Sequence, residues 1–121
     1  MTKTVLTVDD SRTMRDMLLL ALQDAGYTVI QAVDGVDGLE TLAAKGADVV
    51  ITDINMPRMD GFGFIEGMRA DPNHKATPVL VLTTESDAAK KQRAREAGAT
   101  GWIVKPFDPA KLIDAVRRVA A

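Results

Sequence analysis

Five short runs rich in β-branched and other apolar residues alternate with five segments of helical periodicity along this chain. The runs predict strands at Thr4–Val8, Thr28–Ala32, Val49–Thr52, Val79–Leu82 and Gly101–Val104. The segments between and after them predict helices over residues 14–25, 35–45, 62–68, 87–97 and 109–119. Connections this short allow only right-handed crossovers between parallel strands. The chain is therefore predicted to have an α/β fold, with a doubly wound parallel sheet of five strands between two layers of helices.

Length and composition narrow the class of protein. The 121 residues are the size of one domain, and we expect residues 1–121 to form a single domain without an appended output domain. The net charge of −2 offers no positive field for nucleic acid or an anionic membrane, so neither is expected as a partner. The chain has no cysteine and no pattern of a signal peptide or membrane span, so we expect a cytoplasmic protein.

Polar side chains stand at the carboxyl ends of four predicted strands. Asp9 and Asp10 follow the first strand, Asp53 the third, Thr83 the fourth and Lys105 the fifth. Parallel strands bring their carboxyl ends to one edge of the sheet, where open α/β proteins bind ligands. Carboxylates gathered there suit hard divalent cations, and Mg²⁺ in particular combines one or two carboxylates with water and phosphate oxygens. The pattern therefore indicates phosphoryl chemistry.

The charges at this edge suggest how Asp53 could react. Crowded carboxylates raise one another's pKa unless a cation intervenes. Mg²⁺ and the Lys105 ammonium group would keep Asp53 ionised and nucleophilic. A carboxylate nucleophile that forms an aspartyl phosphate is a known covalent strategy, in which metal and lysine stabilise charge on the phosphoryl oxygens. Asp53 is thus the candidate phosphoacceptor.

In their order and spacing, these residues resemble the receiver domains of bacterial two-component systems. The resemblance covers the whole length and is strongest to the stand-alone chemotaxis receivers of the CheY type. The motifs that carry it are Val8–Ser11, Asp53–Gly61, Leu82–Thr84 and Lys105–Phe107. It implies a flavodoxin-like sheet with strand order 2-1-3-4-5. It also implies a phosphorylation-activated response regulator that switches partner binding in chemotaxis, not an enzyme, although with autophosphatase activity of its own.

The resemblance also assigns a metal site and a phosphodonor. Asp53 would be both the phosphoacceptor and a ligand of Mg²⁺. Asp10 would bind the metal directly, Asp9 would assist through water, and Asn55 would contribute its backbone carbonyl. A histidine kinase of the CheA type would donate the phosphoryl group.

A further set of residues would form the switch. Lys105 would pair first with the acceptor carboxylate and then with the phosphoryl group, and Thr83 would move to hydrogen-bond a phosphoryl oxygen. Trp102 occupies the position of an aromatic residue that turns inward as the threonine moves. Tryptophan departs from the tyrosine or phenylalanine common there, and Thr84 departs from the small residue that commonly follows the threonine. The Lys105–Pro106 bond is expected to be cis.

Other residues have plain structural interpretations. Met14 and Met17 lie on the apolar stripe of the first helix and are expected in the core. His74 lies in a polar segment between two prolines and is expected at the surface. The fourth helix is rich in alanine, so it should be weakly anchored. Its basic residues form either a solvated face or a docking surface: Lys90, Lys91, Arg93 and Arg95.

Alternative functions share parts of this pattern. A haloacid dehalogenase-type phosphatase also uses an aspartate nucleophile and Mg²⁺, but it typically has a second aspartate two residues later, where this chain has Asn55. A flavodoxin-like cofactor carrier would need a phosphate-binding loop where Asp9 and Asp10 would repel a flavin phosphate. Within the receiver class, a monomeric chain could act on the flagellar motor switch, drain phosphate from a kinase, or serve another phosphorelay.

Overall fold

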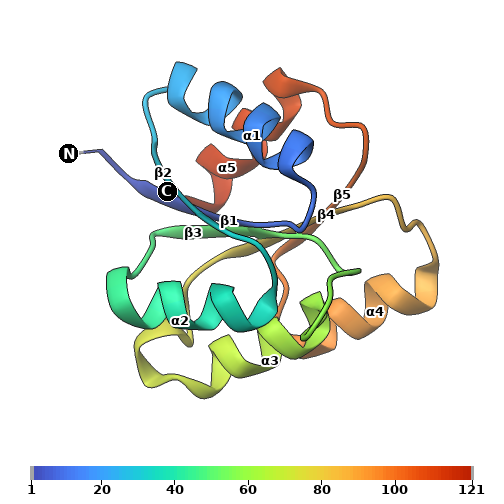
Figure 1. The fold of residues 1–121 in the computed structure, drawn as a ribbon. Helices are drawn as coiled ribbons and strands as arrows, with labels where there is room; N and C mark the ends of the chain where they lie inside the picture. The colour runs from blue at the N-terminus through green and yellow to red at the C-terminus, as the bar shows by residue number, and fades with distance from the viewer. Residues whose placement is uncertain (1, 121) are drawn as a thin grey trace.

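A computed structural model describes residues 2–120 of the chain. Its strands form one parallel sheet in the order β2-β1-β3-β4-β5, which confirms the predicted class and strand order (Figure 1). The strands are β1 (Thr4–Val8), β2 (Thr28–Ala32), β3 (Val49–Thr52), β4 (Val79–Thr83) and β5 (Gly101–Val104). The helices are α1 (Arg12–Asp24), α2 (Gly35–Lys45), α3 (Gly61–Ala70), α4 (Ala88–Ala97), α5 (Pro109–Ala120) and the short 3-10 helix η1 (Pro72–His74).

Helices cover the sheet from both sides (Figure 1). α1 and α5 pack on one face over a buried cluster that includes Leu18, Leu22 and Leu112. α2, α3 and α4 cover the other face, where Phe64 and Met68 are buried. β3 and β4 are buried along their whole length, as expected of strands covered on both faces. Within residues 2–120, no helix is both long enough and apolar enough to cross a membrane.

The register of the sheet brings the ends of the strands to one edge. Asp53, which follows β3, donates its N–H to the carbonyl of Val8 at the end of β1, with N···O 2.9 Å. Lys105, which follows β5, donates its N–H to the carbonyl of Thr83 at the end of β4, with N···O 2.7 Å. These bonds continue the ladders past the strands. The polar side chains beyond β1, β3 and β5 therefore share one rim.

Polar side chains start the helices at their N-termini. The side chains of Ser11, Asp34, Asp60 and Asp87 each accept a backbone N–H bond in the first turn of α1, α2, α3 and α4 respectively. Gly98, with a φ of 116°, ends α4 in the left-handed conformation that favours glycine. At the start of α3, Asp60 Oδ1 accepts the N–H of Gly63 at 2.8 Å, so this residue of the loop after β3 serves as a helix cap.

The core placement of Met17 is wrong. The residue is 45% exposed, because Leu18 and Leu22 occupy the side of α1 that faces the sheet. Met17 instead borders an apolar hollow beside Phe107. Met14 is half-buried and packs against the core, as predicted.

The surface placement of His74 is also wrong. The residue is only 8% exposed, because η1 turns it inward. Its ring Nδ1 lies 3.1 Å from Thr77 Oγ1, and its carbonyl accepts a hydrogen bond from Arg69. The polar residues around His74 suggested an exposed loop, but they did not reveal that Thr77 and Arg69 provide hydrogen-bond partners for a buried histidine.

Candidate functional site

Three carboxylates from two strand ends meet at the carboxyl edge of the sheet. Asp9 and Asp10 follow β1, and Asp53 follows β3. One carboxylate oxygen from each residue lies within 4.8 Å of the corresponding oxygens of the other two. Asp9 and Asp53 are buried, at 2% and 8% exposed. Asp10 faces solvent. Oxygen donors at this spacing suit a hard cation such as Mg²⁺, which could enter from the side of Asp10.

Lys105 places a positive charge between two of these carboxylates. Its Nζ lies 2.8 Å from Asp53 Oδ2 and 2.9 Å from Asp9 Oδ2. Burial opposes the charged form, but hydrogen bonds to Asp53 and Asp9 outweigh it and raise the pKa of the Lys105 ammonium group. The peptide bond to Pro106 is cis, as the resemblance implied. Lys105 therefore remains a cation in direct contact with the candidate phosphoacceptor.

The Asp9 carboxylate is already bound by protein groups. One oxygen accepts from Lys105, and Oδ1 accepts the N–H of Ser11 at 2.9 Å. Burial raises the pKa of the Asp9 carboxyl, while these hydrogen bonds act in the opposite direction. Because Asp10 is exposed, it is the more accessible of the two to an incoming ion.

Asp53 is held in one orientation from both of its oxygens. Lys105 binds Oδ2, and the N–H of Ile54 donates to Oδ1 at 2.6 Å. Thr83 ends β4 at the same edge of the sheet and is fully buried. Its Oγ1 accepts the N–H of Glu85 at 3.4 Å, which is long for a hydrogen bond. The threonine hydroxyl is therefore only weakly held where it stands.

The loop after Asp53 is packed tightly against the acceptor. The N–H of Gly61 donates to the Ile54 carbonyl at 2.8 Å. A Cβ atom at Gly61 would collide with the carbonyl oxygen of Asp53 and would lie 2.8 Å from Ile54 Cα. On the outer side of the loop, Arg58 has a φ of 63° and binds Asp34 through Nε at 2.7 Å and Nη2 at 3.1 Å. The hydrogen bond from Arg58 lowers the pKa of the Asp34 carboxyl, so this pair fastens the loop to the start of α2.

Gly61→Ala is expected to lower the free energy of unfolding by about 1–3 kcal/mol, because the added methyl group has no space against the backbone. Urea denaturation measures the change. Gly63→Ala is a matched control in the same helix, since its Cβ would meet the flexible Met59 side chain at 3.2 Å. Alanine also favours helix over glycine by about 1 kcal/mol, so the control should be neutral or stabilising. If Gly61→Ala were as stable as the wild type, the proposed steric clash between a Cβ atom at position 61 and the backbone of Asp53 would be contradicted.

Glu85, which the sequence analysis did not single out, joins the site to two other elements. Its carboxylate accepts from Asn55 Nδ2 at 3.2 Å and forms an ion pair with Lys90 Nζ at 3.0 Å. Its backbone carbonyl accepts the indole N–H of Trp102 at 3.0 Å. Together with the bond to Thr83 Oγ1, these contacts place Glu85 between the two predicted switch residues. An acid two positions after Thr83 was the only signal in the sequence, and it does not reveal these partners.

The basic residues of α4 fall into two groups. Lys90 is bound by the loop before the helix, and the Arg93 guanidinium carbon lies 4.1 Å from the centroid of the Phe62 ring. Lys91 and Arg95 are exposed. Arg93 is exposed as well, so the predicted solvated face describes Lys91, Arg93 and Arg95 better than it describes the half-buried Lys90.

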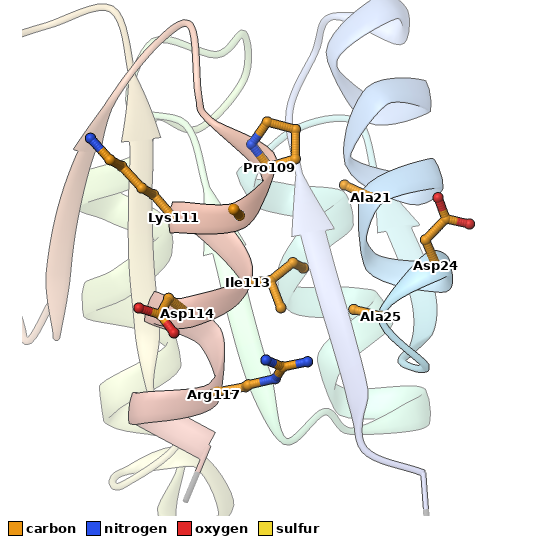
Figure 2. A pocket seen from close by; sticks show the side chains of 9 residues that line it. Ala21, Asp24, Ala25, Pro109, Lys111, Ile113, Asp114 and Arg117 are labelled. Carbon is orange, nitrogen blue, oxygen red and sulfur yellow. The ribbon is translucent and has the colours of Figure 1, made fainter.

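A groove of about 590 Å³ lies between α1 and α5 (Figure 2). Its floor is formed by small and apolar side chains and its rim by charged ones, from Ala21, Ala25, Ile113, Asp24, Asp114 and Arg117. Residues of the acidic cluster do not line it. The groove is therefore separate from the candidate site.

Comparison with known proteins places the chain beside chemotaxis receivers. The sequence profile of the response regulator receiver domain matches residues 5–117. The "Probable chemotaxis protein CheY" of Rhizobium etli is 40% identical over 116 residues, which are 95% of this chain and 90% of that protein. The "Chemotaxis protein CheY1" of Helicobacter pylori is 42% identical, over 87% of this chain and 86% of its own length. The solved structure of Vibrio cholerae CheY4 matches with a TM-score of 0.94 at 46% identity, covering 98% of this chain and 99% of that one.

Proposed function

Because this chain belongs to the family of response regulator receiver domains, we propose that it accepts its phosphoryl group on Asp53. Receiver domains of this kind are phosphorylation-activated signalling switches and not classic enzymes. The observation that carries the proposal is the position of Lys105, whose Nζ lies 2.8 Å from Asp53 Oδ2 and 2.9 Å from Asp9 Oδ2. An ammonium group in contact with the acceptor can also pair with the charge that the transferred group brings.

The proposed reaction is a transfer from phosphohistidine to carboxylate. An oxygen of Asp53 attacks phosphorus while the P–N bond breaks, and the bonding electrons return to the imidazole of the donor. Lys105 orients Asp53 and balances charge on the transferred group, and the Ile54 N–H holds the second carboxylate oxygen. Hydrolysis of the resulting acyl phosphate by water would give the autophosphatase activity that ends the signal.

The donor set fits Mg²⁺, which receiver domains bind at an acidic site. In this chain, Asp10 and Asp53 would hold the ion directly with the carbonyl of Asn55, and Asp9 would hold it through water. When bound, Mg²⁺ supplies positive charge next to the phosphoryl oxygens. Acetyl phosphate labelling, followed as a mass increase of the intact protein, should therefore stop in excess chelator. Labelling at the full rate without free metal would contradict this part of the proposal.

Asp10→Ala is expected to weaken Mg²⁺ binding more than Asp9→Ala does. The exposed Asp10 would lose a direct ligand, whereas Asp9 is already bound by Lys105 and the Ser11 N–H. Loss of a direct charged ligand should weaken affinity by about tenfold or more, in line with a charged hydrogen bond being worth roughly 1.5–3 kcal/mol. Calorimetric titration of both variants with MgCl₂ measures the order. If Asp9→Ala had the larger effect, the two assigned roles would be exchanged.

The signal is proposed to pass from Thr83 to the surface of α4 and β5. Movement of Thr83 toward the phosphoryl group would break its weak bond to Glu85, whose carbonyl holds Trp102 and whose carboxylate holds Lys90. The partner face would change with these contacts. A bound ligand shifts such an equilibrium only through its differential affinity for the two states, and the Thr83 hydroxyl is the proposed source of that difference.

We further propose a cytoplasmic, monomeric regulator that receives phosphate from a CheA-type kinase, and the names of the chemotaxis relatives support the chemotaxis role. Its output would be the flagellar motor switch, with a phosphate sink as the second candidate. Affinity capture with the beryllofluoride form of the protein separates the two. Enrichment of a motor component over the untreated protein supports the first, and enrichment of a kinase alone supports the second.

A further inference from the structure

Arg69, near the C-terminal end of α3, makes four hydrogen bonds to three backbone carbonyls. Nη1 donates to the carbonyls of His74 and Thr77 at 2.7 Å each. Nε and Nη2 both donate to the carbonyl of Gly98, at 3.3 Å and 2.8 Å. Burial lowers the pKa of the Arg69 guanidinium, which reflects its partial removal from water. All of these guanidinium donors therefore bind backbone carbonyl groups. Lysine could not replace them fully, because its single ammonium group lacks the planar arrangement of donors.

Arg69 links two backbone segments: the turn before β4, which contains His74 and Thr77, and the C-terminal end of α4. Gly98 caps this helix, and its N–H bonds to the carbonyls of Ala94 and Arg95. A Cβ atom at Gly98 would lie 2.7 Å from Arg69 Nε, so the two groups are in tight contact. Of the helix Ala88–Ala97, all of which is described, only Ala94 is fully buried. The C-terminal end of α4 therefore has both the buried side chain and the guanidinium contact, next to α3 (Figure 1).

The N-terminal end of α4 is held by weaker contacts. Ala88 and Ala89 are exposed. The Lys90–Glu85 ion pair is partly exposed, at 41% and 30% for the two side chains, and surface pairs of this kind contribute little. Glu85 in turn contacts Thr83 only through the long 3.4 Å bond. The Asp87 side chain also caps this end, but that contact lies within the helix itself. The contacts of this end with the rest of the protein therefore run through the loop beside the phosphoacceptor.

We infer that Arg69 anchors the C-terminal end of α4 as a pivot, about which the N-terminal half of the helix moves when the loop containing Thr83 and Glu85 rearranges. The anchor follows from the contacts of the resting protein, while its use in signalling rests on the proposed function of Asp53. Because α4 rises about 1.5 Å per residue, a small tilt at the pivot displaces its first turn the most.

Residue-resolved amide hydrogen exchange by NMR tests the anchor in the resting protein. In the wild type, the amides of Ala97 and Gly98 should exchange at least about tenfold more slowly than those of Lys91 and Gln92. Arg69→Gln should raise exchange at Ala97 and Gly98 by about tenfold or more, with a smaller effect from Arg69→Lys, because lost charged hydrogen bonds permit local opening. Arg95→Gln is the matched control, which removes an exposed arginine of the same helix and should change neither.

Beryllofluoride with Mg²⁺ tests the pivot in the wild type, so the result does not depend on whether a variant folds. Exchange at Lys91 and Gln92 should change at least about tenfold more than exchange at Ala97 and Gly98. Equal changes at both ends would overturn the pivot. Uniform exchange along α4 in the resting protein would overturn the anchor, whatever beryllofluoride does. The resting gradient without any beryllofluoride effect would contradict the proposed function of Asp53 and support the anchor alone.

Discussion

The Asp53→Asn variant is expected to lose phosphoryl uptake completely while keeping its fold. The amide is a far weaker nucleophile than the carboxylate, so no acyl phosphate should form with acetyl phosphate or a kinase. The amide oxygen can still accept the Ile54 N–H, and Lys105 keeps its contact with Asp9. The free energy of unfolding should therefore change by less than about 1 kcal/mol. Intact-protein mass spectrometry follows the labelling, and urea denaturation follows the stability.

Asp60→Asn is the matched control for this experiment. It removes an acid from the same loop, but asparagine caps a helix as well as aspartate does, so α3 should be retained. This control should be labelled like the wild type. Stoichiometric labelling of Asp53→Asn, or its loss from Asp60→Asn in a folded protein, would contradict Asp53 as the acceptor.

The Thr83→Ala variant is expected to bind beryllofluoride but to lose most of the change in tryptophan fluorescence. Trp102 is the only tryptophan, and its indole N–H is bound to the carbonyl of Glu85, whose N–H contacts Thr83 Oγ1. Without the Thr83 hydroxyl, bound beryllofluoride cannot form the hydrogen bond that would move the loop containing Thr83 and Glu85. Affinity should fall by about ten- to a hundredfold, which still permits saturation, because a hydrogen bond to a charged group is worth roughly 1.5–3 kcal/mol.

Two neighbouring variants sharpen this prediction. Thr83→Ser keeps the hydroxyl and should keep the fluorescence response. Thr84→Ala removes an exposed hydroxyl next to the switch and should have little effect. An unchanged response in Thr83→Ala would mean that Trp102 senses the metal site directly, and the coupling through Glu85 would then be abandoned.

Local pattern and topology were enough to predict the rim of the sheet. Apolar runs located the strands, and parallel pairing placed whatever follows them at one edge, which is why the sequence could bring Asp53, Asp9 and Lys105 together. The strand order came from the family resemblance, because periodicity does not fix which strands are neighbours. The chemical roles of these residues remain predictions.

The contacts made by long side chains could not be predicted. Arg69 reaches the carbonyl of Gly98, 29 residues away, and Glu85 meets Asn55 from 30 residues away. Such pairs depend on how α3, α4 and the loops pack, and no spacing in the sequence encodes that packing. Met17 is a local example of the same problem. Helical periodicity predicted an apolar stripe on α1, but it did not show which residues of that stripe lie at its border and remain exposed.

The most direct test of the account is to locate the phosphoryl group chemically. Borohydride reduces an aspartyl phosphate to homoserine, which tandem mass spectrometry identifies by its position in the chain. After labelling with acetyl phosphate and Mg²⁺, we expect homoserine at position 53 and aspartate at positions 9, 10 and 60. Homoserine at any of those three positions, or a label that borohydride does not convert, would contradict Asp53 as the phosphoacceptor.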